Sequence, residues 1–183
     1  MHGLNNAQLP LTVGILVFDQ VEVLDVAGPF EVFTVTRLNK ELRQEESSPF
    51  RVLLVSENMD QVSAVGGLRF SPDVTHDNCP ELDLLIVPGG WGTRTQVKNA
   101  NLLKWIANKS RRTRLTGSVC TGSSLLGEAG LLDGRQARHI GVLLISSDGL
   151  PPKLTYVKIC ELLWTGLYSL PQASPQESIW LCI

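Results

Sequence analysis

Residues 115–132 read LTGSVCTGSSLLGEAGLL, and this stretch decides the fold because it predicts a strand, a tight turn and a helix in direct succession. The strand is expected over Thr113–Val119 and the helix over Thr121–Ala129, with Cys120 at the junction. Glycines on either side of the cysteine leave room for a sharp turn that lifts its side chain out of the sheet edge. The start of the helix favours a thiolate at Cys120, which predicts a nucleophile. The alternative is a buried cysteine that acts as a small hydrophobic residue.

Strand-like and helical patterns alternate on both sides of this stretch. Pro29 interrupts one helical pattern, which predicts a bend or a late helix start there. The alternation predicts an α/β fold with an open, doubly wound, mostly parallel sheet, in which ligands bind at the carboxyl ends of strands. The strands are expected at residues 12–18, 50–56, 83–87 and 113–119, a β-hairpin at 61–70, and the helices at 23–42, 96–110 and 121–129.

Two further segments carry recognisable motifs. Residues 13–33 read VGILVFDQVEVLDVAGPFEVF, and residues 83–92 read DLLIVPGGWG. Together with SVCTGS they resemble the DJ-1/PfpI superfamily, above all its isocyanide hydratase-like branch and the amidase-like domains fused to AraC-type regulators. The resemblance runs in order from Thr12 to Ala137. It implies a DJ-1/PfpI-like domain over 12–137 with the flavodoxin-like sheet of class I glutamine amidotransferases.

The resemblance also assigns roles to particular residues. Cys120 matches the nucleophile, and Asp25 matches the acid that lies against its sulfur and carries the proton. The alternative for Asp25 is an N-terminal helix residue favoured by the helix dipole. The Gly89-Gly90 turn is expected to bind substrate. The backbone N–H groups of Gly90 and Thr121 are expected to form an oxyanion hole.

Composition excludes several function classes. The chain has 183 residues with a formal net charge of −2, and no basic stripe favours nucleic acid. No apolar run reaches membrane-spanning length, and the N-terminus has no signal-peptide pattern. The spacing of the four cysteines predicts neither a disulfide framework nor a metal site, and the three histidines are scattered. We therefore expect a cytoplasmic protein that uses no metal or other cofactor.

The sequence changes character after Ala137. Relatives continue at this point with Thr-Thr-His-Trp-Gly, whose codons can be written ACG ACA CAT TGG GG. Deleting one A from GCA ACG ACA CAT TGG GG gives GCA CGA CAC ATT GGG, which encodes the Ala-Arg-His-Ile-Gly of residues 137–141. The same shifted frame across Ser169–Ile183 permits Thr-Ser-Ala-Gly-Val-Ser-Ala-Gly-Ile-Asp-Met-Ala-Leu-Tyr, the last strand and helix of the family.

We therefore interpret residues 138–183 as an aberrant, out-of-frame tail; a genuinely divergent C-terminus is the alternative. Loss of the family's last strand and helix is expected to expose apolar surface and an unpaired sheet edge. His139 arises from the shifted reading and lies one place early, so the role of the family histidine is not transferred to it.

Three functions remain open from the sequence. The first is a cysteine-dependent hydratase or hydrolase of a small electrophilic substrate, of the isocyanide hydratase type. The second is a non-enzymatic ligand-sensing domain related to AraC-type regulators. The third is an inactive product of a frameshifted gene. Relatives are usually homodimers, and a small-molecule substrate is the expected partner, with no nucleic acid and no membrane.

Overall fold

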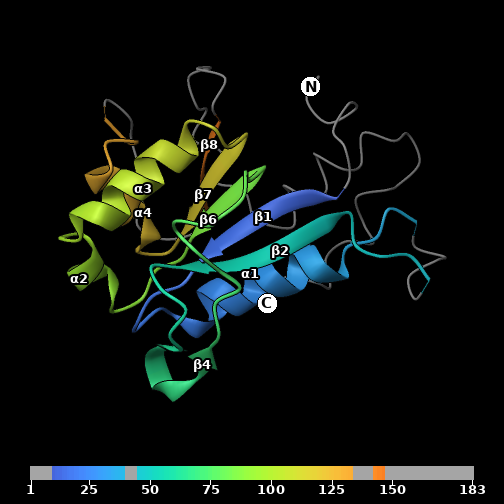
Figure 1. Cartoon of the computed structure of the whole chain (residues 1–183), viewed down its shortest axis with the longest axis horizontal. Helices are drawn as coiled ribbons and strands as arrows, with labels where there is room; N and C mark the ends of the chain where they lie inside the picture. The colour runs from blue at the N-terminus through green and yellow to red at the C-terminus, as the bar shows by residue number, and fades with distance from the viewer. Residues whose placement is uncertain (1–9, 40–44, 134–141, 147–183) are drawn as a thin grey trace.

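A computed structural model of the chain describes residues 10–39, 45–133 and 142–146. Its centre is a six-stranded sheet with the strand order β5-β2-β1-β6-β7-β8 (Figure 1). The five strands from β5 to β7 in this order are parallel to their neighbours, and β8 is antiparallel to β7. The bounds of these strands are β1 Leu11–Leu16, β2 Phe50–Ser56, β5 Val74–Thr75, β6 Leu84–Val87, β7 Leu115–Val119 and β8 Val142–Ser146.

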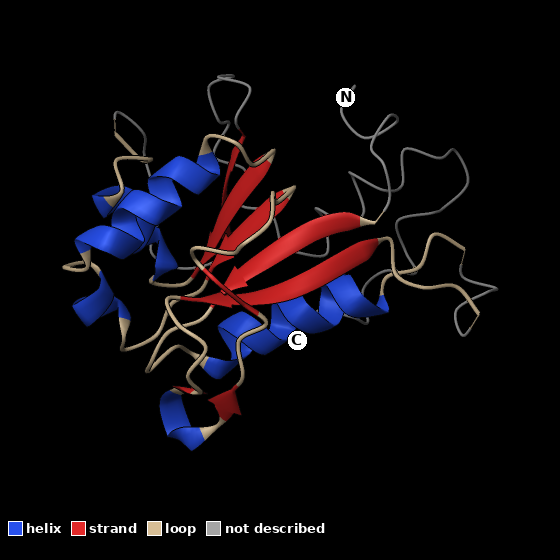
Figure 2. Ribbon diagram, viewed as in Figure 1, coloured by secondary structure: helices blue, strands red, loops and turns tan. Residues whose placement is uncertain are grey.

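Helices cover both faces of the sheet (Figure 2). Helix α1, Val23–Val35, packs against β1 and β2, whereas α3, Ala100–Ser110, lies on the opposite face. The short helix α2, Thr93–Gln96, and helix α4, Gly122–Glu128, contact each other, and α4 also contacts α3, β6 and β7. The predicted doubly wound sheet is therefore confirmed.

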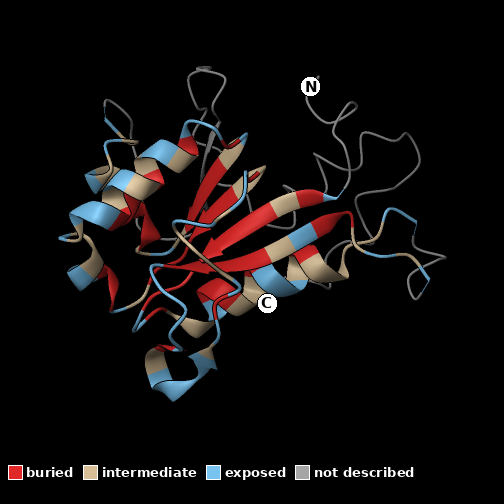
Figure 3. Cartoon of the chain, in the orientation of Figure 1, coloured by how far each residue is buried: buried red, intermediate tan, exposed pale blue. Residues whose placement is uncertain are grey.

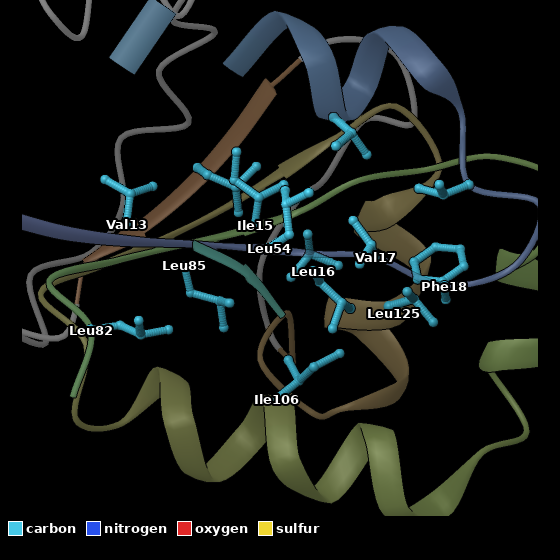
Figure 4. Packing of buried hydrophobic residues seen from close by; sticks show 14 of the residues in the cluster. Val13, Ile15, Leu16, Val17, Phe18, Leu54, Leu82, Leu85, Ile106 and Leu125 are labelled. Atoms are coloured by element: carbon cyan, nitrogen blue, oxygen red, sulfur yellow. The ribbon is translucent and has the colours of Figure 1, made fainter. Parts of the chain in front are cut away.

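The core lies between these layers because the central strands are apolar at successive positions. Val13, Ile15 and Leu16 of β1 are fully buried, as expected for a parallel strand covered on both faces. Figure 4 shows Leu16 on the side of the sheet that faces α3, with Ile106 and Leu125, and shows Val13 and Ile15 on the opposite side of the strand. Buried positions follow the central strands, and exposed ones gather on the outer helix surfaces (Figure 3).

The helices differ from the predicted bounds. Helix α1 begins at Val23 with Pro29 inside it, so of the two expected effects of Pro29, a bend or a late helix start, the late start is wrong. The helix ends at Val35, because Thr36 is extended, and not at residue 42. The helix expected over 96–110 begins only at Ala100, and Gln96 is the last residue of the separate helix α2. The Asn99 side chain caps the start of α3, because it accepts a hydrogen bond from the Leu102 N–H at 3.2 Å.

The predicted hairpin over 61–70 is present. Strands β3, Val62–Ser63, and β4, Arg69–Phe70, pair antiparallel around a 3-10 turn at Val65–Gly67. Both Gly66 and Gly67 have positive φ, which is the conformation that glycine tolerates.

Strand β8 falls in the segment assigned above to the aberrant tail, where no strand was expected. Its backbone pairs with β7 from Leu115↔Ser146 to Val119↔Val142. The outer edge of β7, which was expected to be unpaired, is therefore occupied. The sequence of β8, VLLIS, is rich in the apolar and β-branched residue types that favour strands. This preference holds whether or not the segment is read in the original frame of the gene. His139 and residues 147–183 lie outside the described residues.

Candidate active site

The predicted turn between β7 and α4 has the geometry of a nucleophile elbow. Cys120 adopts a left-handed backbone with φ of 50°, which is uncommon for a residue with a side chain. Its carbonyl accepts a hydrogen bond from Ser123 Oγ at 3.2 Å, which closes the first turn of the helix. The Cys120 side chain is exposed and its thiol is free. The elbow is confirmed, while the nucleophilic role of the thiol stays a prediction.

Gly122 lets the helix approach the neighbouring strand closely. A Cβ at this position would lie 2.1 Å from the carbonyl oxygen of Val87, the last residue of β6. Only a residue without a side chain permits that approach. The ends of β6 and β7 are thus drawn together at the carboxyl edge of the sheet.

Gly89 occupies the centre of the site, between Asp25 and the elbow. An added Cβ would lie 2.6 Å from the Thr121 backbone nitrogen and 2.9 Å from Asp25 Oδ2. These two atoms are therefore at most 5.5 Å apart, the sum of the 2.6 Å and 2.9 Å distances. The structure brings together Asp25, Gly89, Gly90, Cys120 and Thr121, which we call the Cys120 site.

Asp25 lies in the first turn of α1 and is 8% exposed. Its Oδ2 accepts a hydrogen bond from the Gly89 N–H at 2.9 Å. Burial raises the pKa of Asp25 above its ordinary value, the Gly89 N–H opposes this, and the nearby Glu22 carboxylate adds to it. A buried carboxyl whose pKa is raised above its ordinary value is suited to hold and deliver a proton.

The backbone donors expected to form an oxyanion hole are in different states. The Gly90 N–H donates to Thr121 Oγ1 at 3.0 Å, and the Gly89 N–H is bound to Asp25. The Thr121 N–H forms no hydrogen bond with any residue that the structure describes. Of the two expected donors, the Thr121 N–H is therefore open among the described residues. The Gly90 N–H is already bound to the Thr121 hydroxyl.

The loop after β1 closes the site from the other side. Val21 and Gly90 form an antiparallel bridge, and the Glu22 N–H donates to the Gly89 carbonyl at 2.9 Å. Gly90 has φ of 121° and a Cβ there would lie 2.4 Å from the Glu22 nitrogen, so this position requires glycine.

Sequence reasoning missed Thr93. This residue is buried, and its Oγ1 donates to the Gly90 carbonyl at 2.8 Å and lies 3.4 Å from Thr121 Oγ1. The available signal was a hydroxyl residue at the helix start directly after the Gly89–Gly92 turn. Thr93 thus positions both Gly90 and the Thr121 hydroxyl.

Within residues 10–39, 45–133 and 142–146, no group of three or more His, Cys, Asp or Glu residues could hold a metal ion. No helix in that part of the chain is long and apolar enough to cross a membrane.

Comparison with known proteins agrees with this geometry. A sequence model of the DJ-1/PfpI family matches residues 11–142. The chain belongs to the DJ-1/PfpI family. A crystal structure of a ThiJ/PfpI family protein from Pseudomonas syringae is similar with a TM-score of 0.58 at 29% identity, covering 72% of this chain and 52% of that one.

Two curated relatives of the chain differ in function. Isonitrile hydratase from Pseudomonas putida is 36% identical over 130 residues, which cover 70% of this chain and 52% of the hydratase. The HTH-type transcriptional regulator GbdR from Pseudomonas aeruginosa is 34% identical over 125 residues, which cover 68% of this chain and 32% of the regulator. The chain thus spans about half of one relative and a third of the other.

Proposed function

We propose that this DJ-1/PfpI domain is a cysteine-dependent hydratase that adds water to a small electrophilic carbon, such as the terminal carbon of an isonitrile. The observation that carries the proposal is the packing at Gly89, which holds the Asp25 carboxyl within 5.5 Å of the Thr121 nitrogen in the elbow, the sum of 2.6 Å and 2.9 Å. The similarity to isonitrile hydratase supports the substrate class. The free thiols of Cys79 and Cys120 fit the reducing cytoplasm in which we place the reaction.

The proposed reaction begins with attack by the Cys120 thiolate on the terminal carbon of the isonitrile. Asp25 holds the thiol proton and delivers it to the same carbon, which leaves a thioimidate linked to sulfur. Water then adds its hydroxyl to that carbon and a proton to nitrogen. Collapse of the adduct expels the thiolate, returns the hydroxyl proton to Asp25 and releases an N-substituted formamide. The net change is addition of one water, with no redox step and no cofactor.

The open Thr121 N–H is proposed to stabilise the negative charge that develops during these steps. The Gly90 N–H joins it when the Thr121 hydroxyl turns away. In acyl-transfer enzymes each such donor contributes about 3 kcal/mol.

The test is hydration of cyclohexyl isonitrile by the full chain in ¹⁸O-labelled water, followed by mass spectrometry of the formamide. We expect one ¹⁸O in the product, activity in the Cys79→Ala control, and none in Cys120→Ala. Equal rates in Cys120→Ala and the wild type would refute the proposal.

The similarity to an HTH-type regulator favours a second candidate, a domain that binds a small molecule without converting it. This candidate predicts saturable binding that survives Cys120→Ala, with no formamide produced by either protein. The interpretation of residues 138–183 as out of frame adds a third outcome, a chain that neither binds nor turns over any isonitrile. The same assays on the protein made from a gene with the frame restored separate this outcome from the first two. If the frameshift is the cause, that protein regains binding or turnover.

A further inference from the structure

Two threonine hydroxyls and the backbone of Gly90 form a closed ring of polar contacts in the Cys120 site. The Gly90 N–H donates to Thr121 Oγ1 at 3.0 Å, and Thr121 Oγ1 lies 3.4 Å from Thr93 Oγ1. Thr93 Oγ1 in turn donates to the Gly90 carbonyl at 2.8 Å. The three residues come from the turn after β6, the start of α2 and the elbow before α4, so the ring joins segments that are separate in the chain.

The distances indicate which way each hydroxyl proton points. A threonine hydroxyl has one proton to donate and lone pairs with which to accept. The Thr93 proton is on the Gly90 carbonyl, because that contact is 2.8 Å long, against 3.4 Å to Thr121 Oγ1. The lone pairs of Thr93 Oγ1 are therefore available to the Thr121 hydroxyl, which can donate to Thr93 while it accepts from the Gly90 N–H.

The turn at Gly90 closes without the Thr93 hydroxyl. The Thr93 N–H donates to the same Gly90 carbonyl at 3.3 Å, and the Gln96 N–H donates to the Gly92 carbonyl at 3.0 Å. These backbone bonds form whatever the side chain at position 93. Thr93 is 4% exposed, and a buried hydroxyl costs free energy unless it is hydrogen-bonded. The contact with Thr121 is thus the part of this arrangement that turn formation does not explain.

We propose that Thr93 is a positioning residue for the oxyanion hole, because its Oγ1 keeps the Thr121 hydroxyl bonded when the Gly90 N–H passes to the substrate. This inference rests on the proposed hydratase function, in which the Gly90 N–H is the second donor. With Thr93 in place, release of that N–H leaves no buried hydroxyl unpaired. Without the Thr93 hydroxyl, the remaining partners of Thr121 Oγ1 among the described residues are the N–H and the carbonyl of Gly90 itself. The Thr121 hydroxyl then stays on Gly90 and keeps the second donor occupied.

Thr93→Val tests this role, because valine keeps the branched side chain and lacks the hydroxyl. Thr113→Val is the matched control. Thr113 is also buried, and its Oγ1 also donates to a backbone carbonyl, that of Lys109, at 2.8 Å, but it precedes β7, at the opposite end of that strand from the elbow. Both variants should lose similar free energy of unfolding, since each loses one buried donor. Thr93→Ser keeps the hydroxyl and should behave as the wild type.

Two reactions of Cys120 separate the oxyanion hole from the thiol. Acylation by p-nitrophenyl acetate passes through a tetrahedral oxyanion before p-nitrophenolate leaves, whereas alkylation by iodoacetamide displaces iodide and forms no oxyanion. Both rates are measured on the full chain from the mass of the Cys120 peptide. Since loss of one oxyanion-hole donor costs about 100-fold or more in rate, we expect Thr93→Val to slow acylation at least about 10-fold relative to alkylation. Thr113→Val and Thr93→Ser should keep the wild-type ratio of the two rates.

Several results would overturn the role of Thr93. They are an unchanged ratio in Thr93→Val, and an equal fall of the ratio in Thr113→Val or Thr93→Ser. A wild-type ratio equal to that of N-acetylcysteine would also overturn it, because there would be no oxyanion hole to position. This measurement needs no turnover of isonitrile, so a chain that hydrates no isonitrile refutes the proposed function and not the role of Thr93.

Steady-state hydration of cyclohexyl isonitrile gives a second measurement. Thr93→Val should lower kcat at least about 10-fold and leave KM within about 3-fold, because the second donor is used only as charge develops in the transition state. A KM that rises while kcat is unchanged would contradict the proposal, since Thr93 would then contribute to substrate binding alone.

Discussion

Replacement of Gly89 by alanine tests the close packing at the site, because it adds one methyl group without adding backbone strain. The backbone of Gly89 lies outside the left-handed region, so alanine can adopt it without strain, and the only cost is steric. The new Cβ would lie 2.6 Å from the Thr121 nitrogen, which is 0.8 Å short of the 3.4 Å at which ordinary contact begins. Neither neighbour can move freely, because Thr121 belongs to the elbow and Asp25 to α1. Overpacking of this kind costs about 1–3 kcal/mol, and we expect about 2–3 kcal/mol here.

Gly28→Ala is the matched control in the same part of the molecule. Gly28 lies in α1 three residues after Asp25, and a Cβ there would meet no atom within 4 Å. Alanine in a helix interior is more stable than glycine by about 0.5–1 kcal/mol. The two alanine variants should therefore change the free energy of unfolding in opposite directions.

Urea denaturation followed by circular dichroism and by tryptophan fluorescence measures both effects, with coincident transitions as the check for two-state unfolding. We expect Gly89→Ala to lose stability and Gly28→Ala to gain it. Gly89→Ala should also lose the proposed hydratase activity, because the new methyl group displaces Thr121 or Asp25. A Gly89→Ala variant that is as stable and active as the wild type would refute the close packing from which the site is argued.

Three further predictions concern the thiol, the carboxyl group and the reading frame. Iodoacetamide followed by peptide mapping should modify Cys120 before Cys79, because Cys120 is exposed whereas burial raises the pKa of the Cys79 thiol; equal labelling would contradict this. Asp25→Asn should lower turnover at least about 100-fold and leave the fold intact. Burial raises the pKa of Asp25, so the folded protein holds this proton more tightly than the unfolded chain. The stability contributed by Asp25 should therefore fall as the pH rises above the ordinary value of 3.8, and denaturation across pH should show no such fall in Asp25→Asn. Insertion of one base at codon 138 should restore Thr-Thr-His-Trp and give a dimer with a cooperative melt and thiol-dependent activity; a chain that already melts cooperatively and turns over substrate as it stands would show that the frameshift has no functional effect.

The central strands were predictable because their apolar runs report burial directly. The apolar runs within β1 and β2 and over the whole of β6 leave few alternatives to a parallel sheet covered on both faces. The elbow was predictable for a different reason, since glycines flank a cysteine between a strand pattern and a helix pattern.

The ends of several elements were not predictable, because tertiary and side-chain interactions set them. The end of α1 at Val35 has no terminating residue in the sequence, and the break before α3 depends on one hydrogen bond that the Asn99 side chain accepts from the Leu102 N–H. Strand β5 has two residues, too few for a periodicity to appear. Strand β8 pairs with an edge that its own sequence does not reveal.

The contacts of the site join residues that are far apart in the chain. Asp25 and Gly89 are separated by 64 positions, and only the resemblance to a family placed them together before the structure did. Thr93 could not be found in this way, because the direction of a threonine hydroxyl toward Gly90 depends on the packing of α2 against α4.

Backbone strain gives a further reason to regard this edge of the sheet as functional. Among the described residues, Cys120 and Gln20 are the two non-glycine positions with positive φ, at 50° and 61°. Gln20 lies in the loop after β1, and its carbonyl accepts a hydrogen bond from the Gly92 N–H at 3.0 Å, in the turn that carries Gly90. Each such conformation costs about 1–3 kcal/mol and persists only where the surroundings impose it. The strained residues therefore belong to the loops that meet at one edge, where β1, β6 and β7 end and where the proposed reaction is placed.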